Sequence, residues 1–363
     1  MTSPDRLSDI PTPALVVDVN ALERNLRRMA AFFAPRHCQL RPHFKAHKTP
    51  EIARRQLAAG ACTGLTCATA FEAEIAAPLC DDILIASEVV GADSCRRVAA
   101  LAKRVRMTVV VDSTIGLDAI SVAAREAGVT IGALVDVNVG QNRCGVAPGA
   151  SAVALGTLVA SASGVTLRGL MGYEGHAVAI ANRRERETAV CASMQQLLTT
   201  KRLFDEAGLA TTTISAGGTG SFDIGGAMDG ITEIQAGSYA LMDTDYARLD
   251  LPFEHALFVL GTVISRPAPE RCVADCGHKS CTKDHGLPSV KGLPGASVLA
   301  LNDEHATIAL PPGCVLAIGD RIQLLPSHVD PTMNLHDVVY ALEGDDVIGA
   351  WAVAARGYSG AGR

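Results

Sequence analysis

Eight short apolar segments alternate with longer amphipathic ones through the first two-thirds of the chain. The apolar segments are rich in Val, Ile, Leu and Thr, which is typical of strands buried on both faces of a parallel sheet. They cover residues 39–43, 64–69, 82–89, 107–112, 131–139, 167–173, 211–216 and 233–242. Eight strand–helix repeats predict an α/β fold, a (β/α)8 TIM barrel. A doubly wound open sheet is the alternative, because the alternation alone does not exclude it.

The amphipathic segments have the length and apolar period of helices. Three of them end at a glycine, Gly60, Gly128 or Gly208, and glycine is the residue that favours a helix C-terminus. An apolar run at 14–19 and a helix from about Asn20 precede the first barrel strand.

After about residue 250 the pattern changes to short strand-like runs separated by Pro and Gly clusters. This pattern predicts a mostly antiparallel β domain. The expected domains are therefore the barrel over 24–250 and a C-terminal β domain over 251–363, with residues 1–23 joining the β domain.

Charge and hydropathy bear on the class of partner. Lys+Arg number 32 against 38 Asp+Glu, a net charge of −6, whereas nucleic-acid-binding proteins are usually basic. No run approaches the roughly 18 apolar residues of a membrane span. The N-terminus does not resemble a signal peptide, and the eleven cysteines are scattered, so we expect a cytoplasmic protein with reduced thiols.

A parallel barrel carries its active site at the C-terminal ends of its strands, and polar residues collect there in this sequence. The first strand ends in RPHFKAHK (41–48), the fifth in NVGQNR (138–143) and the sixth in YEGH (173–176). The seventh ends in SAGGTGS (215–221), and the eighth carries QAGSY (235–239). We expect the candidate site to be built from these segments.

The turn after the seventh strand reads Gly217-Gly218-Thr219-Gly220. Glycines allow several backbone N–H groups to converge, which is how a phosphate is held. A plain tight turn is the more frequent explanation, but phosphate sites favour the loops after the last strands of a barrel. No Walker lysine follows, so a phosphorylated cofactor fits better than a nucleoside triphosphate.

Lys45 follows the first strand, with His43, His47 and Lys48 close in sequence. Desolvation and neighbouring cations can hold a lysine amine neutral, and a neutral amine forms Schiff bases. A solvated basic loop is the alternative. A lysine and a phosphate turn in one barrel mouth favour pyridoxal 5'-phosphate as the cofactor.

His328 and Asp330 lie in the sequence PSHVDPT (326–332). In an extended chain, residues two apart point the same way, so the imidazole and the carboxylate can bind one divalent ion. Two protein ligands leave positions open for substrate and water. A surface loop without function is the alternative, because the H-x-D spacing is common.

Together these motifs resemble the D-threonine aldolase/D-serine dehydratase-like family, pyridoxal-phosphate enzymes of fold type III related to alanine racemase. The likeness runs from TPA (12–14) through DEH (303–305) to PSHVDPT (326–332), with Ala46 where Thr is more usual. It implies that Lys45 carries the Schiff base, that the turn from Gly217 to Gly220 holds the phosphate, and that the enzyme is a homodimer. The other implied cofactor contacts are Arg143, Tyr173 and Tyr239.

The resemblance also implies a divalent metal on His328 and Asp330, Mn²⁺ ahead of Zn²⁺, Mg²⁺ or Co²⁺. Members with His and Cys two apart resemble zinc dehydratases, and members with His and Asp resemble aldolases. Asp330 therefore favours a lyase that cleaves D-β-hydroxy-α-amino acids, of the D-threonine or 3-hydroxy-D-aspartate type, to glycine and an aldehyde. The base would be His176, Lys45 or a water on the metal.

Three alternatives to the aldolase stay open. The first is a metal-dependent D-serine or D-3-hydroxyaspartate dehydratase, because the same metal can activate the hydroxyl as a leaving group. The second is a non-catalytic carrier of pyridoxal phosphate, which would have no use for His328 and Asp330. The third is an amino-acid racemase, which would need no metal.

Overall fold

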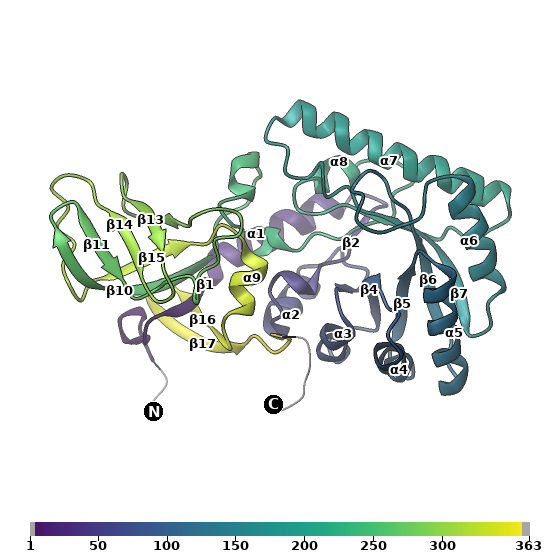
Figure 1. The fold of residues 1–363 in the computed structure, drawn as a ribbon, viewed down its shortest axis with the longest axis horizontal. Helices are drawn as coiled ribbons and strands as arrows, with labels where there is room; N and C mark the ends of the chain where they lie inside the picture. The colour runs from purple at the N-terminus through teal and green to yellow at the C-terminus, as the bar shows by residue number, and fades with distance from the viewer. Residues whose placement is uncertain (1–3, 358–363) are drawn as a thin grey trace. The chain divides into compact units, whose positions relative to one another are not determined.

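A computed structural model describes residues 4–357 of the chain (Figure 1). These residues divide into two compact units. The barrel unit comprises 29–45 and 53–237, and the β unit comprises 4–28, 46–52 and 238–357. The domain limits expected from the sequence stay a prediction, and their ends at 1–3 and 358–363 lie outside the described part.

The barrel unit contains one parallel strand for each of the eight predicted apolar segments. They are β2 (Gln39–Leu40), β3 (Leu65–Cys67), β4 (Asp82–Glu88), β5 (Arg106–Val111), β6 (Ile131–Asp136), β7 (Val165–Gly172), β8 (Thr213–Ala216) and β9 (Glu233–Ile234). Their order is β2-β9-β8-β7-β6-β5-β4-β3. Parallel bridges join Leu40 to Cys62 and His43 to Thr66, so the segments around β2 and β3 close the ring. The (β/α)8 prediction is confirmed, and the open sheet is wrong.

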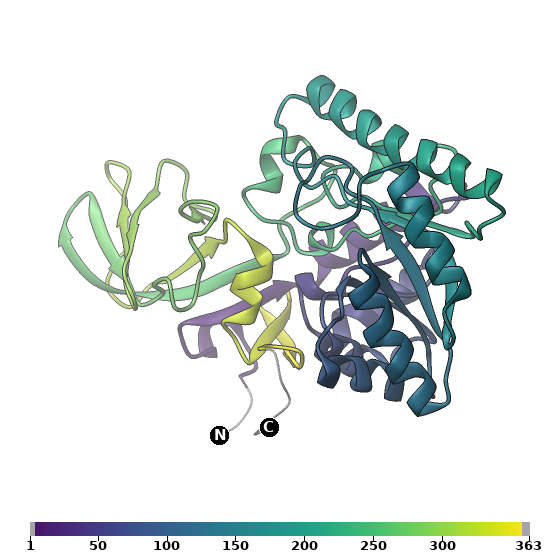
Figure 2. The ribbon, with the colours of Figure 1, turned by 45° about the vertical axis from the view of Figure 1, so that its right-hand side comes forward.

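Helices lie outside these strands in both ribbon views (Figures 1 and 2). They are α3 (Ala70–Ala76), α4 (Ala92–Leu101), α5 (Thr114–Ala127), α6 (Ala150–Ser161), α7 (Arg183–Glu206) and α8 (Phe222–Gly225). Two more, α1 (Val19–Phe33) and α2 (Pro50–Ala59), have residues in both units. Local chemistry sets the ends of α5: Ser113 accepts a hydrogen bond from the Gly116 N–H, and Gly128 ends the helix at φ +67°, where glycine has no steric penalty.

A buried ion-pair network lies at the N-terminal ends of the strands. The Arg41 guanidinium donates to Asp82, the first residue of β4, at 3.1 Å and to Glu233, the first residue of β9, at 2.9 Å. The Arg41 side chain is only 3% exposed. Our expectation that the whole 41–48 segment faces the barrel mouth is therefore wrong for Arg41, because its two carboxylate partners lie at the opposite end.

The β unit is built around a sheet of order β13-β14-β11-β10-β1-β16-β17, with β15 paired to β10 and β12 to β15. The strands are β1 (Ala14–Asp18), β10 (Leu257–Ala268), β11 (Arg271–Ala274), β12 (Ser289–Val290), β13 (Ser297–Leu301), β14 (Ala306–Ala309), β15 (Arg321–Leu325), β16 (Val338–Glu343) and β17 (Asp346–Ala352). Pairing is antiparallel, as predicted, except between β1 and β16. Strand β1 lies between β10 and β16, so the N-terminal segment completes this sheet.

The core beside β1 joins residues from both ends of the chain. Its buried members are Ile10, Ala14, Val16, Phe258, Leu260 and Leu342. Sequence reasoning missed β17, an edge strand with no fully buried residue, although its half-buried face carries Val347 and Trp351 and Val347 packs against this core.

None of the helices within residues 4–357 is long and apolar enough to cross a membrane. All eleven cysteines are free thiols. Cys272, Cys276 and Cys281 are fully buried, and burial raises the pKa of each thiol, so they pack as small apolar side chains.

Candidate active site

Lys45 lies in a short 3-10 helix, Phe44–Ala46, which follows β2 after three intervening residues. The His43 N–H donates to the Ala236 carbonyl at 3.0 Å, and the Phe44 side chain is fully buried. These contacts fix the backbone on the N-terminal side of Lys45, whose own side chain is half-buried. His47 and Lys48, which follow, are buried as well, so the solvated basic loop is wrong.

The glycine-rich turn joins β8 to α8 and is organised around one carboxylate. Glu174 is fully buried and accepts hydrogen bonds from the Gly217 N–H at 3.2 Å and from the Ser221 hydroxyl. The Gly218 N–H donates to Ser221 Oγ at 3.2 Å. Burial raises the pKa of Glu174, and the bonds from Ser221 and Gly217 oppose that shift. The amides of Gly217 and Gly218 therefore hold the turn itself together.

Gly220 occupies a position that only glycine can fill. A Cβ on Gly220 would lie 2.0 Å from the Val178 carbonyl oxygen, a backbone atom that cannot rotate away. A Cβ on Gly218 would lie 3.4 Å from the Tyr173 ring, which is ordinary contact. The segment after β7 and the turn after β8 are thus packed backbone against backbone at Gly220.

The loop after β6 brings Arg143 to the same region. Its base is pinned by hydrogen bonds of Val146 with Asp136 and Asn138. The Arg143 guanidinium carbon lies 5.5 Å from the centre of the Tyr173 ring. Arg143, Tyr173 and the turn after β8 are therefore gathered at one end of the barrel, as the sequence motifs suggested.

His176 is exposed and lies against the same loop. A Cβ at Gly140, where φ is +120°, would lie 2.7 Å from the imidazole of His176. Glycine at 140 therefore makes room for the imidazole beside the backbone.

Sequence reasoning missed an acidic cluster beside this loop. Glu88 ends β4, Asp136 ends β6, and Asp112 follows β5. Potential ligand atoms of Glu88, Asp112 and Cys144 lie within 4.8 Å of one another. Burial, the hydrogen bond and charge of Glu88, and the charge of Asp112 raise the pKa of Asp136 to about 8, while Arg143 opposes the shift. Acids at the ends of three successive strands were the available signal.

In the β unit, His328 and Asp330 lie at the start of helix α9 (Val329–Asn334). His328 is the extended N-cap residue, and Asp330 is in the first helical turn. Our expectation of an extended chain through both residues is wrong, because Pro331 suits a first helical turn, where its missing N–H costs nothing.

Asp243 fixes the start of α9. This fully buried carboxylate accepts from the Val329 N–H at 3.0 Å and from the Tyr246 N–H at 2.9 Å. Burial raises the pKa of Asp243 to about 6, against the effect of those two hydrogen bonds. Two further residues that sequence reasoning missed, Asp284 and His285, offer ligand atoms within 4.8 Å of one on His328.

Tyr239 also belongs to the β unit, where it lies in the 3-10 helix Ser238–Ala240. It is fully buried, with its ring centre 5.6 Å from that of Phe253. Of the predicted site residues, the barrel unit thus holds Lys45, Arg143, Tyr173, His176 and the glycine-rich turn, and the β unit holds Tyr239, His328 and Asp330.

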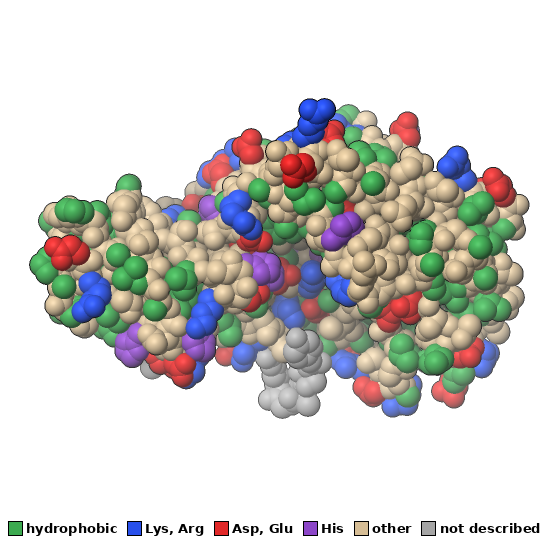
Figure 3. All heavy atoms as spheres, turned by 45° about the horizontal axis from the view of Figure 1, so that its top comes forward, with side chains coloured by type: hydrophobic (Ala, Val, Ile, Leu, Met, Phe, Trp, Pro, Cys, Tyr) green, Lys and Arg blue, Asp and Glu red, His purple; other side chains and the backbone are tan. Residues whose placement is uncertain are grey.

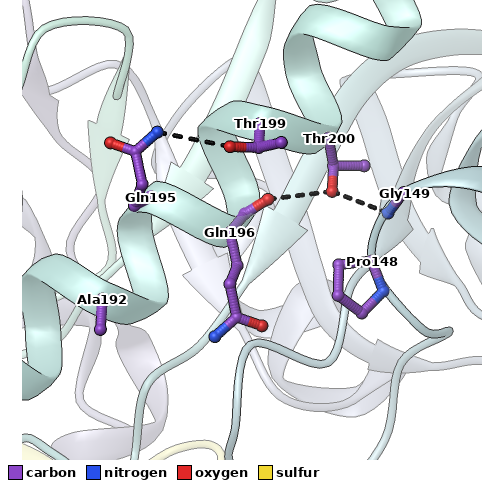
Figure 4. Close-up of a pocket in the computed structure, with 7 residues that line it drawn as sticks. All are labelled: Pro148, Gly149, Ala192, Gln195, Gln196, Thr199 and Thr200. Carbon is purple, nitrogen blue, oxygen red and sulfur yellow. Dashed lines mark hydrogen bonds between the residues drawn. The ribbon is translucent and has the colours of Figure 1, made fainter.

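A cavity of about 430 Å³ lies beside α7, on its face toward residues 148–149 (Figure 4). Its lining residues are Pro148, Gly149, Ala192, Gln195, Gln196, Thr199 and Thr200. These carry no ionisable group, so the lining side chains offer no titratable acid or base. On the face that Figure 3 shows, basic and acidic side chains are intermixed.

Family models match most of the chain. The model for the alanine racemase N-terminal domain matches residues 17–245, and that for a putative serine dehydratase domain matches 256–342. The chain is 42% identical to D-threonine aldolase of an Arthrobacter species over 98% of its own length and 95% of the relative. It is 33% identical to 3-hydroxy-D-aspartate aldolase of Paracoccus denitrificans over 96% and 93%.

Solved structures of enzymes of the same kind are similar to this chain over nearly its whole length. The crystal structure of D-threonine aldolase from Filomicrobium marinum has a TM-score of 0.95 at 39% identity, covering 98% of both chains. D-threo-3-hydroxyaspartate dehydratase from Delftia has a TM-score of 0.88 at 26% identity, covering 98% of this chain and all of that one. Of its variants, a cysteine-to-alanine form was solved metal-free, and another replaces a histidine two positions earlier.

Proposed function

The chain belongs to the alanine racemase-like family of fold-type III pyridoxal-phosphate enzymes, in the branch that includes D-threonine aldolase, and from this premise we propose a metal-assisted aldolase. It cleaves D-β-hydroxy-α-amino acids to glycine and an aldehyde. The observation that carries the proposal is the pairing of Lys45 and a glycine-rich turn in one barrel with a histidine and an aspartate two positions apart.

The residues of the barrel mouth fit pyridoxal 5'-phosphate. Lys45 supplies an amine for covalent attachment, on a backbone fixed by its neighbours. The glycine-rich turn from Gly217 to Gly220 would hold the phosphate through its backbone, on a turn shaped by the bonds of the Gly217 and Gly218 amides. Once bound, the cofactor withdraws electrons from the substrate Cα.

Arg143 and Tyr173 would flank the cofactor in this proposal. The guanidinium already lies near the Tyr173 ring, and a ring beside Gly218 is well placed to contact a group held by the turn. Tyr239 is carried over from the family resemblance as a further cofactor residue.

His328 and Asp330 fit a hard or borderline divalent ion, with Mn²⁺ preferred and Zn²⁺, Mg²⁺ or Co²⁺ as substitutes. Solved variants of D-threo-3-hydroxyaspartate dehydratase replace a histidine and a cysteine with this same spacing, and the structure of the cysteine variant is of its metal-free form. The buried Asp243 holds the helix start that presents both residues. Bound there, a divalent ion lowers the pKa of a substrate hydroxyl.

His176 is our first candidate for the base that takes the β-hydroxyl proton, with Lys45 as the second. Its imidazole is exposed and held against Gly140, so it can accept a proton from a substrate in the barrel mouth.

The dehydratase is the second candidate function. It is supported by 26% identity and a TM-score of 0.88 to the Delftia enzyme. Against it, this chain has Asp330 at the position where the dehydratase-like members have a cysteine. Of the three cations that could hold the second carboxylate of 3-hydroxy-D-aspartate, Lys279 bonds Glu304 and Lys283 bonds the Leu301 carbonyl. Arg143, beside Tyr173, is the remaining candidate, so D-threonine and 3-hydroxy-D-aspartate are both proposed as substrates.

A cytoplasmic homodimer is the setting we propose. Eleven free thiols support a reducing compartment. The dimer rests on the family resemblance alone, and sedimentation of the purified protein tests it.

The test is incubation of the purified protein with D-threonine, D-serine or 3-hydroxy-D-aspartate, in Mn²⁺ or in EDTA. Aldehyde, glycine, 2-oxo acid and ammonia are measured. We expect aldehyde and glycine in Mn²⁺ and none in EDTA. Ammonia with 2-oxo acid would refute the aldolase, and aldehyde release unchanged by EDTA would remove the metal from the reaction.

A further inference from the structure

The imidazole of His328 is held through one ring nitrogen. His328 Nδ1 lies 2.7 Å from Asp284 Oδ2. A carboxylate can only accept a hydrogen bond, so this contact places the hydrogen of a neutral imidazole on Nδ1. The lone pair is then on Nε2, which is the atom left to bind a metal.

His285 supports the ring face. The rings of His285 and His328 are stacked, with centres 4.0 Å apart and planes at 9°. Lone pairs of ring nitrogens lie in the ring plane, so those of two parallel rings do not converge on one ion. His285 therefore packs on His328, and its own Nδ1 lies 3.1 Å from Asp245.

Asp284 is itself held by a closed cycle of hydrogen bonds. Its Oδ1 accepts from the Thr282 hydroxyl at 2.7 Å, and the Thr282 N–H donates to Thr332 Oγ1 at 3.3 Å. The Thr332 hydroxyl donates to the His328 carbonyl at 2.8 Å. The cycle of hydrogen bonds thus closes at His328, whose side chain and backbone are both fixed relative to Asp284.

We propose that Asp284 is a positioning residue of the metal site: it sets the tautomer and the orientation of His328 so that Nε2 faces the ion. This rests on the proposed function, because it assumes a metal on His328 and Asp330. Asp284 acts through His328 and is not itself a ligand. Carboxylates that orient a metal-binding histidine in this way typically change metal affinity by 10- to 100-fold.

The experiment uses the full-length holoenzyme, stripped with EDTA and titrated with Mn²⁺ while free Mn²⁺ is followed by electron paramagnetic resonance. We expect Asp284→Ala to weaken Mn²⁺ binding by about 10- to 100-fold. Asp284→Asn should lose less, because its amide oxygen can accept the same hydrogen. The matched control is Asp303→Ala, which removes an equivalent aspartate, 2.8 Å from His278 Nε2 in the same unit, and should leave Mn²⁺ binding unchanged.

Nitrogen NMR of His328 in the metal-free protein gives a readout independent of metal and turnover. We expect the Nδ1–H tautomer in the wild type and a shift toward Nε2–H in Asp284→Ala, with an unchanged melting temperature. Wild-type affinity in Asp284→Ala would overturn the inference and leave the proposed function intact. Equal losses in the Ala and Asn variants would make Asp284 a ligand and also overturn it. A wild-type protein that binds no Mn²⁺ would refute the metal site and the inference together.

Discussion

The variant Asp136→Asn should gain stability relative to the wild type as the pH rises. The pKa of Asp136 is raised from the ordinary 3.8 to about 8, first by burial and then by Glu88 and Asp112. Between these values the folded chain keeps a proton that the unfolded chain releases. The free energy of unfolding of the wild type therefore falls with pH in this window, by about 1.4 kcal/mol per pH unit from this group.

The Asn variant has no proton to keep, and its amide can still donate to Glu88. Its stability relative to the wild type should therefore rise by about 2.7 kcal/mol between about pH 5 and pH 7. Urea unfolding of both proteins, followed by circular dichroism, measures this difference. Other groups that titrate in the window, such as Asp243, are common to both proteins and cancel.

The control is Asp93→Asn. Asp93 is exposed and pairs with Arg96 at 3.4 Å, and such exposed pairs contribute little. A difference between Asp136→Asn and the wild type that stays constant with pH, or that shrinks as the pH rises, would refute the assignment of a retained proton to Asp136.

Three further predictions concern single residues of the barrel unit. Gly220→Ala should lose cofactor binding, measured by visible absorbance, because its Cβ would lie 2.0 Å from the Val178 carbonyl, whereas Gly218→Ala should retain it. Lys45→Ala should show no covalent label by mass spectrometry after borohydride reduction with pyridoxal phosphate, and labelling at wild-type yield would place the attachment elsewhere. Arg41→Met should destabilise the protein by about 3–5 kcal/mol in urea unfolding, because it leaves the buried Glu233 without Arg41 and removes one of the three arginines that pair with Asp82; a loss below about 1 kcal/mol would contradict that reasoning.

The parallel strands could be located from sequence because each is a short apolar run bounded by polar or glycine residues. Whether the sheet closes could not, because closure depends on pairing between residues far apart, such as His43 and Thr66. Two elements, α9 and β17, were not predicted from the sequence for a different reason. Helix α9 spans only six residues, too few for a periodic apolar signal. In β17 apolar residues lie on both faces, with Val347 and Trp351 half-buried and Ile348 and Ala350 exposed, so the sequence does not alternate between apolar and polar.

Some residues of the candidate site could be predicted from sequence, and others could not. Lys45, Arg143 and the glycine-rich turn could be named because each follows a recognisable strand. Asp284 could not, because its contact with His328 joins the loop after β11 to the start of α9, and the fold of the β unit brings these together. The role of Gly217 could not be predicted either, because its amide donates to the buried Glu174, which lies 43 residues away in the sequence.

The position of β1 constrains how the chain reaches its fold during synthesis. This strand is made first, but it pairs with β10, from residue 257, and with β16, from residue 338. At about 5–20 residues per second, a ribosome needs roughly 15–65 s to deliver β16 after β1. The whole barrel is translated in that interval, while the Ala-Leu-Val-Val run of β1 waits without its partners. We therefore expect chaperones that bind apolar segments to engage the nascent β1 segment, and the β unit to fold after the barrel.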